Sequence, residues 1–328
     1  DHNGSRGLGD VYKRQTFGES HGGCVGAVVD GCPAGLELAV EDIQLELNRR
    51  RPGQSSITSE RLEEDRIEIL SGVFEGSTTG APILLLAHNR DARSQDYEAL
   101  RGVLRPSHAD YTYLAKYGRR DWRGGGRSSA RETLARVAAG AIAKKFLGEK
   151  LGVELISYVE QVGDIKLGVD FSRVSREQIE ANAVRCPDPE TAQEMIDLIE
   201  QLRDEGDSVG GILCGCIRGL PAGLGEPVFD KFAADLGKAL LSINAVKGFE
   251  FGSGFAGATM RGSEHNDQFY SNTEQGIRTL SNFSGGTQGG ITNGEDVYFR
   301  VAMKPVSTIV KRQKTLTQAG KELSLIHI

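Results

Sequence analysis

The segment Arg105–Thr133 reads RPSHADYTYLAKYGRRDWRGGGRSSARET and combines a histidine, three successive glycines and many arginines. Between Arg101 and Lys145 there are 11 lysines or arginines and 3 acidic residues, a local charge of +8 (11 − 3). The whole chain carries −6, so the rest of it sums to −14. Because the basic residues are concentrated in one part of an acidic protein, the pattern indicates a site for an anion, not a generally basic protein that binds nucleic acid.

The end of this segment predicts the start of a helix. Ser129 and Glu132 have the S-x-x-E spacing of a capping box, which places the first helical residue near Ala130. Apolar residues then recur at helical spacing: Leu134, Val137, Ala138, Ala141, Ile142 and Phe146. The first N–H groups would point back toward Gly124–Gly126, an arrangement that favours phosphate. The alternative is an ordinary capped helix after a glycine turn, with the arginines on a solvated face.

Composition indicates an ordinary soluble protein. The chain has 328 residues, enough for one large domain or two. Glycine accounts for 43 of them, against an average near 7%, which predicts many tight turns. Cys214 and Cys216 alternate as neighbours on a strand do, and the chain has no C-x-x-C pair, so we expect reduced thiols, a cytoplasmic location and no metal site. The longest apolar run, Ala81–Ala87, is too short to span a membrane.

Hydrophobic periodicity, caps and turn residues predict mixed secondary structure. Further helices are expected over Glu41–Arg50, Arg176–Val184, Pro189–Glu205 and Asp230–Ser242. The third has Asp188 as its cap, Pro189 at its first position and Gly206 after its end. Strands are expected over Cys24–Asp30, Arg66–Ser71, Ile83–His88, Val153–Val162, Gly211–Arg218 and Val297–Lys304. Because these elements do not alternate as regular βαβ units, we predict an α+β fold.

Three more segments are rich in glycine. TFGESHGG (Thr16–Gly23) places His21 before an apolar strand, where a histidine could act as an acid or base. NAVKG (Asn244–Gly248) follows a predicted helix, and SGGTQGGI (Ser284–Ile291) precedes a strand that runs into KPVST (Lys304–Thr308). Each is also consistent with plain turn chemistry. The chain contains neither a Walker loop nor a G-x-G-x-x-G after a strand, which disfavours a generic nucleotide-binding fold.

Taken together, these segments resemble the chorismate synthase family. The matching stretches run in order from about Thr16 to about Thr308: TFGESHG, NRRRPG, ILSGVFEGSTTGAPI, RSQDY, the block Arg105–Leu147, GDSVGG, PAGLGEPVFD, SINAVKGFE, GGTQGGITNGED and MKPVST. The resemblance implies an α+β sandwich of mixed and antiparallel sheets with helices, in a single large domain, and a homotetramer.

The resemblance also implies the chemistry. The family eliminates phosphate and a ring hydrogen from 5-enolpyruvylshikimate 3-phosphate to give chorismate, an anti-1,4-elimination in the shikimate pathway of aromatic amino acid biosynthesis. Reduced FMN assists without net redox change, and NADPH is a candidate reductant of the flavin. Arginine forks suit the carboxylates and phosphate of such a substrate. A different phosphate enzyme, such as a kinase, is disfavoured because the Walker loop and an acidic metal cluster are missing.

Roles are carried over by matching position. His21 and His108 resemble the two family histidines, with His21 assigned to the departing phosphate and His108 to the flavin. Ser20, Arg50, Arg105 and Arg131 resemble ligands of substrate or cofactor anions. The positions that resemble the flavin site are Arg127, Ser128, Ser129, Asn244, Ala245, Gly289, Lys304, Pro305, Val306, Ser307 and Thr308. His88 and His265 match no functional position.

The ends depart from the family pattern. We interpret residues 1–15 as a non-native leader, 16–322 as the family domain without its C-terminal part, and 323–328 as a non-native tail. The family continues past KPxST to a GRHDPC motif, absent here, and Ser56 stands where some members have an arginine linked to the nicotinamide nucleotide. The alternative function is therefore a catalytically impaired fragment that retains binding of flavin or phosphate.

Overall fold

In a computed structural model of the chain, the structure describes residues 14–51, 53, 64–90, 94–168, 170, 173–273 and 276–326. They form two compact units, one within residues 14–146 and 312–326 and the other within residues 147–311. Both units combine helices with antiparallel sheets, which confirms the predicted α+β class.

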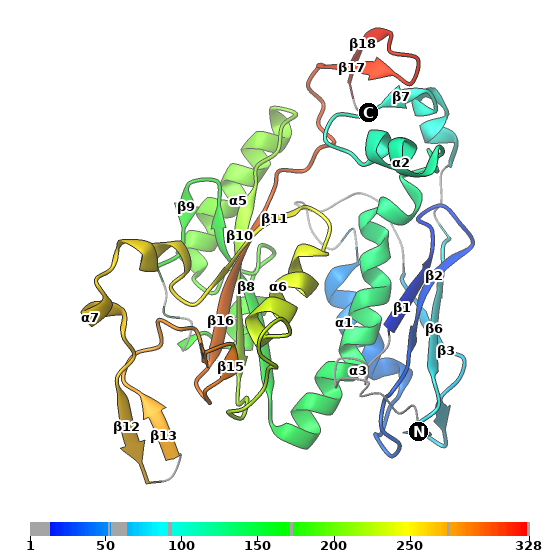
Figure 1. Cartoon of the computed structure of the whole chain (residues 1–328). Helices are drawn as coiled ribbons and strands as arrows, with labels where there is room; N and C mark the ends of the chain where they lie inside the picture. Colours follow the sequence, from blue (N-terminus) through cyan, green and yellow to red (C-terminus); the bar gives the residue numbers. More distant parts are fainter. Residues whose placement is uncertain are drawn as a thin grey trace. The chain divides into compact units, whose positions relative to one another are not determined.

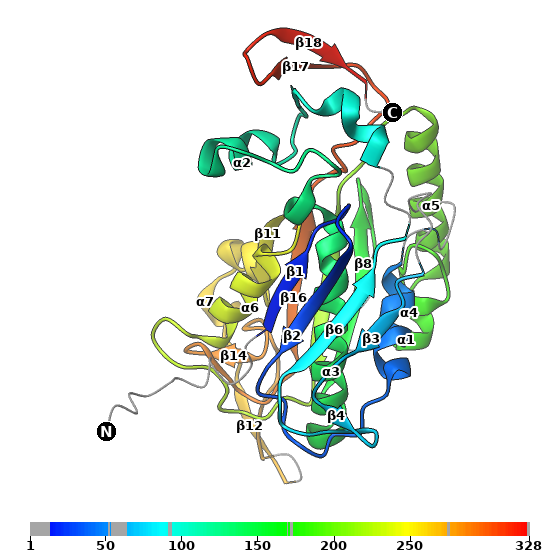
Figure 2. The ribbon, with the colours of Figure 1, turned by 90° about the vertical axis from the view of Figure 1, so that its right-hand side faces the viewer.

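The first unit is built on a four-stranded antiparallel sheet with the order β1-β2-β6-β3. Its strands are β1 (Arg14–Gly18), β2 (Cys24–Val29), β6 (Ile83–His88) and β3 (Ile67–Ile69), and Figure 2 shows them side by side in this order. The chain turns between β1 and β2, which pair in register from Arg14↔Val29 to Gly18↔Val25. That connection is the TFGESHGG segment, so the sheet itself fixes both ends of the loop that holds His21.

One face of this sheet packs against two helices, α1 (Val40–Arg50) and α3 (Thr133–Leu151), which lie on the same side of it in Figure 1. The alternating pattern of a strand is visible in β6, where every second residue from Ile83 to Ala87 is buried. The side chains in this core include Val25, Ala27, Ile43, Leu47, Ile67, Ile83, Leu85, Ala87, Leu134, Ala138 and Ile142. The core thus packs β2, β3 and β6 against α1 and the first turns of α3.

Shorter elements complete the first unit. They are β4 (Val73–Phe74), β5 (Ser77–Thr78), η2 (Ser94–Leu100), β7 (Val103–Leu104), α2 (Asp110–Tyr117), the 3-10 turns η3 (Gly126–Ser128) and η4 (Ala130–Glu132), β17 (Gln313–Thr317) and β18 (Glu322–Leu325). β17 pairs with both β18 and β7, as seen at the top of Figure 1. The late segment 312–326 therefore belongs to the first unit.

The second unit contains a five-stranded antiparallel sheet with the order β11-β16-β10-β8-β9. The strands are β8 (Glu154–Val162), β9 (Ile165–Lys166), β10 (Gly211–Arg218), β11 (Val246–Phe251) and β16 (Val297–Met303). Ile217 and Val297, directly opposite each other, share the face that packs with Phe232 and Leu236 of α6 (Phe232–Leu241).

The opposite face of β10 carries Cys214 and Cys216, as the alternation in the sequence predicts. Both thiols are buried, and burial, the largest effect, raises the pKa of Cys216 to about 12. The thiol is therefore protonated at neutral pH and is a poor nucleophile or metal ligand.

The remaining elements of the second unit are α4 (Arg176–Glu180), α5 (Pro189–Asp204), η6 (Gly254–Thr259), α7 (Gly262–His265), β12 (Phe269–Asn272), β13 (Gly276–Thr279), β14 (Thr287–Gln288) and β15 (Ile291–Thr292). The predicted cap of α5 is confirmed: the Asp188 carboxylate accepts from Thr191 N–H at 2.8 Å, and Gly206 follows the helix in the left-handed region. No helix within the described ranges is long and apolar enough to cross a membrane.

Most predicted elements exist with shifted ends. Two predicted helices are shorter in the structure: Arg176–Val184 ends as α4 at Glu180, and Asp230–Ser242 is reduced to α6. The strand predicted over Arg66–Ser71 is also shorter in the structure: β3 covers Ile67–Ile69, the residues that pair with β6. The prediction missed α2, β11 and β1, the last because Arg14 and Gln15 were assigned to the leader although they pair with β2.

Replacing Leu85 in the central strand β6 tests the core of the first unit. Leu85 is fully buried, so we expect Leu85→Ala to lower the free energy of unfolding by about 2–5 kcal/mol. Leu70, which is 52% exposed, provides the control, and Leu70→Ala should change stability by less than about 1 kcal/mol. Urea unfolding followed by circular dichroism measures both, and equal losses would contradict this packing.

Candidate active site

The Ser20–His21 loop lies between β1 and β2 in the first unit. Ser20 is buried; its hydroxyl donates to the Gly124 carbonyl at 3.2 Å and lies 3.0 Å from Nδ1 of His21. Because the single hydroxyl proton is directed to Gly124, the hydroxyl oxygen accepts from Nδ1–H. In this tautomer the proton of the neutral ring is on Nδ1, and Nε2 carries none. The ring of His21 also contacts Tyr97 edge to face, with centroids 5.0 Å apart.

The glycine turn Gly124–Gly126 is the wall against which His21 packs. All three residues have φ between +54° and +86°, a region that residues with a side chain rarely adopt. A β-carbon on Gly124 would lie 2.2 Å from Cε1 of His21, and one on Gly125 would lie 3.1 Å from Oγ of Ser128 and 3.7 Å from the Arg105 guanidinium. The absence of side chains here therefore allows His21, Arg105 and Ser128 to approach one turn.

His108 lies in the turn that follows Arg105. Its backbone N–H donates to the Arg105 carbonyl at 3.2 Å, and its Nδ1 lies 2.9 Å from the Pro106 carbonyl. Because a carbonyl can only accept, Nδ1 of His108 carries a proton. Ser107, between them, has φ +57°, so the turn is bent tightly enough to fix the ring relative to Arg105.

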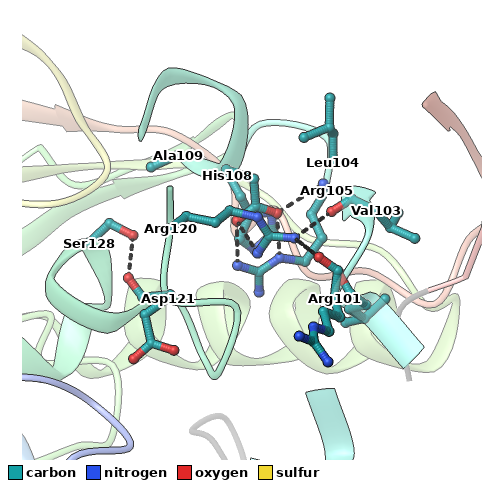
Figure 3. A network of polar contacts seen from close by, with 12 residues as sticks. Arg101, Val103, Leu104, Arg105, His108, Ala109, Arg120, Asp121 and Ser128 are labelled. Atoms are coloured by element: carbon teal, nitrogen blue, oxygen red, sulfur yellow. Dashed lines mark hydrogen bonds and ion pairs between the residues drawn. The ribbon is translucent and has the colours of Figure 1, made fainter. Parts of the chain in front are cut away.

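Arg105 is held by Asp110 in a two-pronged ion pair. Nε and Nη2 of Arg105 lie 2.9 Å from the two carboxylate oxygens, and the Arg105 N–H donates to the same carboxylate at 3.0 Å. Arg120 contacts Asp110 at 3.3 Å and donates to the carbonyls of Leu100, Arg101 and Val103, as Figure 3 shows for several of these contacts. Two guanidinium groups and one carboxylate leave this cluster with a net charge of +1.

The protonation of Asp110 follows from the same contacts. Burial raises the pKa of Asp110, but hydrogen bonds from the Arg105 side chain and backbone, together with the charges of Arg105 and Arg120, outweigh it. The pKa of Asp110 is held below its ordinary value of 3.8. The carboxylate is therefore ionised at neutral pH and orients both arginines.

A second buried carboxylate, Asp65, joins Arg50 and Arg131. Its oxygens lie 3.1 Å from Nη1 of Arg50 and 2.7 Å from Nη1 of Arg131. The Asp65 side chain is 0% exposed. Nε of Arg131 donates to Asn89 at 2.6 Å. This cluster also has a net charge of +1.

The sequence predicted that free backbone N–H groups at the start of the helix would bind phosphate, and this prediction is wrong. A 3-10 turn, η4, precedes α3, and the N–H groups of Ser128, Ser129 and Glu132 donate to the carbonyls of Gly125, Gly126 and Ser129. The capping box is also incomplete: Ser129 caps through Arg131 N–H, whereas Glu132 accepts from Thr16 and Arg136. These three amides donate within the chain and are therefore not the free donors that the prediction required.

A cavity of about 550 Å³ opens beside the glycine turn. It combines aromatic and cationic walls: Tyr113, Tyr117, Trp122, Arg119, Arg123, Arg127 and Ser128 are among its lining residues. Arg127 is anchored by donating to the Gly18 carbonyl at 2.9 Å and to Thr16 Oγ1 at 2.6 Å. Two of the residues assigned to the flavin, Arg127 and Ser128, therefore line a cavity within the size range of small-molecule sites.

In the second unit, the predicted flavin positions form two groups. Ala245 has φ +69°, and its carbonyl accepts from the Lys304 N–H at 3.0 Å, so Asn244–Ala245 meets the segment Lys304–Thr308. Within that segment Nζ of Lys304 donates to Oγ of Ser307.

Gly289 belongs to the other group. It lies in the turn between β14 and β15, where the neighbouring Gly290 carbonyl accepts from Phe232 N–H at the start of α6. Asn244 follows the other end of α6, which is 10 residues long, or roughly 15 Å. The structure therefore does not bring Gly289 and Asn244 together.

Sequence analysis missed the residues that hold the site in place, chiefly Asp65, Asn89, Asp110 and Arg120. Asp110 lies five residues after Arg105, so its spacing was a usable signal. Asp65 lies 66 residues before Arg131, and nothing local indicates that pairing. Ser56 lies outside the described residues. Within the ranges that the structure describes, no group of three or more His, Cys, Asp or Glu residues could hold a metal ion.

Comparison with known proteins gives a consistent result. A family model described as chorismate synthase matches residues 12–328. The chain is 57% identical to the chorismate synthase of Gloeothece citriformis and 58% identical to that of Rippkaea orientalis, in each case over 97% of this chain and 88% of the relative. A crystal structure of a chorismate synthase matches with a TM-score of 0.77 and 36% identity, covering 90% of this chain and 85% of that one.

The chain therefore belongs to the chorismate synthase family. It is an enzyme of the lyase class in aromatic amino acid biosynthesis, as the family resemblance implied. The family also implies a small-molecule substrate and a reduced flavin cofactor.

The Asp110 ion pairs predict a pH-dependent stability. Removing one partner of a buried pair costs about 3–5 kcal/mol, so we expect Asp110→Asn to be destabilised by about this amount at pH 7. Because the folded pKa of Asp110 lies below 3.8, this contribution is present above that pH and is lost as the pH falls through the folded pKa. Wild type and variant should therefore converge in stability below pH 3.8.

Urea unfolding at pH 7, 5, 4 and 3 measures this convergence. Asp164→Asn, at an exposed position in the turn between β8 and β9, is the matched control and should change little at any pH. A difference between wild type and Asp110→Asn that is as large at pH 3 as at pH 7 would show that the ionised carboxylate is not the cause.

Proposed function

We propose that this chain converts 5-enolpyruvylshikimate 3-phosphate to chorismate by anti-1,4-elimination of phosphate, assisted by reduced FMN. One observation supports this proposal above the others: the glycine turn Gly124–Gly126 packs against His21 and lies close to Arg105 and Ser128. A titratable group and a fixed cation beside an open backbone suit a small phosphorylated acid.

His21 is proposed as the acid that protonates the departing phosphate. The Ser20 hydroxyl accepts from Nδ1, so Nε2 is the nitrogen that would deliver the proton. His108 is proposed to maintain the protonation state of the reduced flavin, also through Nε2, because Nδ1 is bound to the Pro106 carbonyl. In both rings the tautomer assigns the proton to Nδ1, and the proposed proton transfer takes place at Nε2.

Arg50, Arg105 and Arg131, with Ser20, are proposed to bind the anionic groups of the substrate. Each arginine is oriented by a buried carboxylate, and each cluster keeps a net positive charge. Because these arginine side chains are oriented before the substrate binds, less side-chain conformational entropy is lost on binding. The substrate carries a phosphate and two carboxylates, which matches a surface with several fixed guanidinium groups.

The residues present fit a flavin phosphate and ring. Arg127 and Ser128 line a cavity with aromatic walls, Gly289 has open space where a β-carbon would lie, and Ala245 adopts a left-handed conformation beside Lys304. We propose that Arg127, Ser128 and Ser129 of the first unit contact FMN. Within the second unit, Asn244, Ala245, Gly289 and Lys304–Thr308 stay assigned to the flavin by the family resemblance alone. Reduced FMN, when bound, supplies an electron transiently and recovers it, and NADPH is the candidate reductant.

We further propose a homotetramer in the cytoplasm. Large apolar side chains are exposed in the second unit, with Phe229 at 88%, Phe255 at 82% and Ile277 at 71%. Exposed apolar groups of this size are typical of surfaces that contact another chain.

Phosphate release tests the proposed function. The chain is incubated anaerobically with dithionite-reduced FMN and 5-enolpyruvylshikimate 3-phosphate, and phosphate and chorismate are measured together. We expect equal amounts of both products and no net oxidation of the flavin. Flavin binding that tightens with substrate but gives no product would instead support the fragment that binds without catalysis.

Replacing the two histidines tests their roles. We expect His21→Ala and His108→Ala each to slow phosphate release by about 10²–10⁴-fold, the usual contribution of an acid–base group. His88→Ala is the matched control. The His88 side chain is exposed, its Nε2 lies 3.7 Å from Oε1 of Glu68, and His88 is not among the residues assigned to the site. Full activity in either active-site variant, with circular dichroism unchanged, would remove that histidine from the mechanism.

A further inference from the structure

We propose that Asp65 and Asn89 are positioning residues: together they hold Arg50, Arg131 and the Ser20–His21 loop in one rigid arrangement. The inference rests on the proposed function, because it deepens the roles given there to His21 and the arginines. Neither residue belongs to a motif that the sequence analysis assigned to the site.

Asp65 is the first link. It comes from the segment before β3, whereas Arg50 ends α1 and Arg131 lies in η4 before α3. Its two oxygens are divided between the two arginines, at 3.1 and 2.7 Å, and its backbone has φ +50°. A fully buried carboxylate in an unfavourable backbone conformation persists only where its surroundings hold it, and here two guanidinium groups do so.

Asn89 is the second link, and its orientation is determined by its partners. Its Oδ1 accepts from Nε of Arg131 at 2.6 Å, and its Nδ2 donates to the carbonyls of Glu19 and Gly22 at 2.9 and 2.8 Å. Because Nε of arginine only donates and carbonyls only accept, the amide cannot be reversed. The Asn89 N–H also donates to the Gly23 carbonyl at 3.1 Å.

The two carbonyls bound by Asn89 lie on either side of Ser20 and His21 in the chain. The other side of the loop is fixed by Ser20, whose hydroxyl donates to Gly124 and whose N–H reaches the Gly126 carbonyl at 3.4 Å. The loop is thus held from two directions, by the glycine turn and by Asn89. A continuous series of polar contacts runs from Arg50 through Asp65, Arg131 and Asn89 to this loop.

This arrangement couples anion binding to the position of the acid. A displacement of about 1 Å at a reacting group can cost about 100-fold in rate, so the contacts that hold His21 affect turnover without contacting the substrate. The contacts of Asp65 orient the arginines and should affect binding, whereas those of Asn89 with the loop should affect the catalytic step.

Two isosteric variants separate these effects. Asp65→Asn removes the charge and replaces one acceptor with an NH₂ group that faces an arginine. Asn89→Asp keeps the acceptor for Arg131 but places an oxygen against the carbonyls of Glu19 and Gly22. Glu160→Gln is the control, because it neutralises another buried carboxylate paired with an arginine, Arg300 at 2.7 Å, in the second unit.

Steady-state phosphate release gives the first readout. We expect Asp65→Asn to raise KM at least about 10-fold, through loss of binding made before the chemical step. Asn89→Asp should lower kcat by about 10- to 100-fold with little change in KM. Glu160→Gln should change neither. A general loss of folded protein would lower kcat in all three variants and would not give this division.

Hydrogen exchange gives a second readout that needs no activity. Amides in a peptide covering residues 16–24 should exchange about 10-fold faster in Asn89→Asp than in wild type, and at the wild-type rate in Glu160→Gln. If Asp65→Asn does not fold, the test of the positioning role rests on Asn89→Asp, since this variant leaves both Asp65 ion pairs in place.

The outcomes are distinguishable. Exchange in residues 16–24 that is unchanged in Asn89→Asp overturns the positioning role, whatever the kinetics. Kinetic effects no larger than those of Glu160→Gln overturn it as well. Should the wild-type chain release no phosphate, the proposed function fails, while faster exchange in Asn89→Asp would still establish that Asn89 holds the His21 loop.

Discussion

The pairing of arginines with two buried carboxylates is the interaction on which the site depends. Asp65 and Asp110 each contact two guanidinium groups, and burying any of these charges alone would be very costly. Together they form clusters that are neutralised enough to be buried and still keep a net charge of +1 each. The protein, with an overall charge of −6, thereby keeps fixed positive charge at the arginines that are proposed to bind the polyanionic substrate.

The glycine turn supplies the complementary constraint. His21, Arg105 and Ser128 can approach one turn because Gly124 and Gly125 carry no side chain, and the turn adopts conformations that other residues rarely adopt. In the proposed site, carboxylates and Asn89 orient the side chains, and the glycines leave space between them.

The start of α3 differs from what the sequence pattern favoured. Ser129 and Glu132 suggested a phosphate site built from backbone amides, yet the 3-10 turns use the amides of Ser128, Ser129 and Glu132 in local hydrogen bonds. In the proposed function the directed donors to an anion are therefore guanidinium groups. The proposed substrate carries its negative charges on three separate groups, which suits arginines that are positioned independently.

The sequence alone determined the family, the α+β class, and the main helices and strands, and it supplied the candidate site residues, because long motifs with unusual glycine, arginine and histidine spacing are local features of the chain. It also indicated the cap of α5, since Asp188 and Pro189 act within one helical turn. Only the tertiary structure showed that Arg50 and Arg131 share Asp65, that Asn89 binds the His21 loop, and that the amides before α3 are already occupied. These are contacts between residues far apart in the chain, or choices between two local hydrogen-bond patterns, and in both cases the surrounding packing decides which partner is within reach.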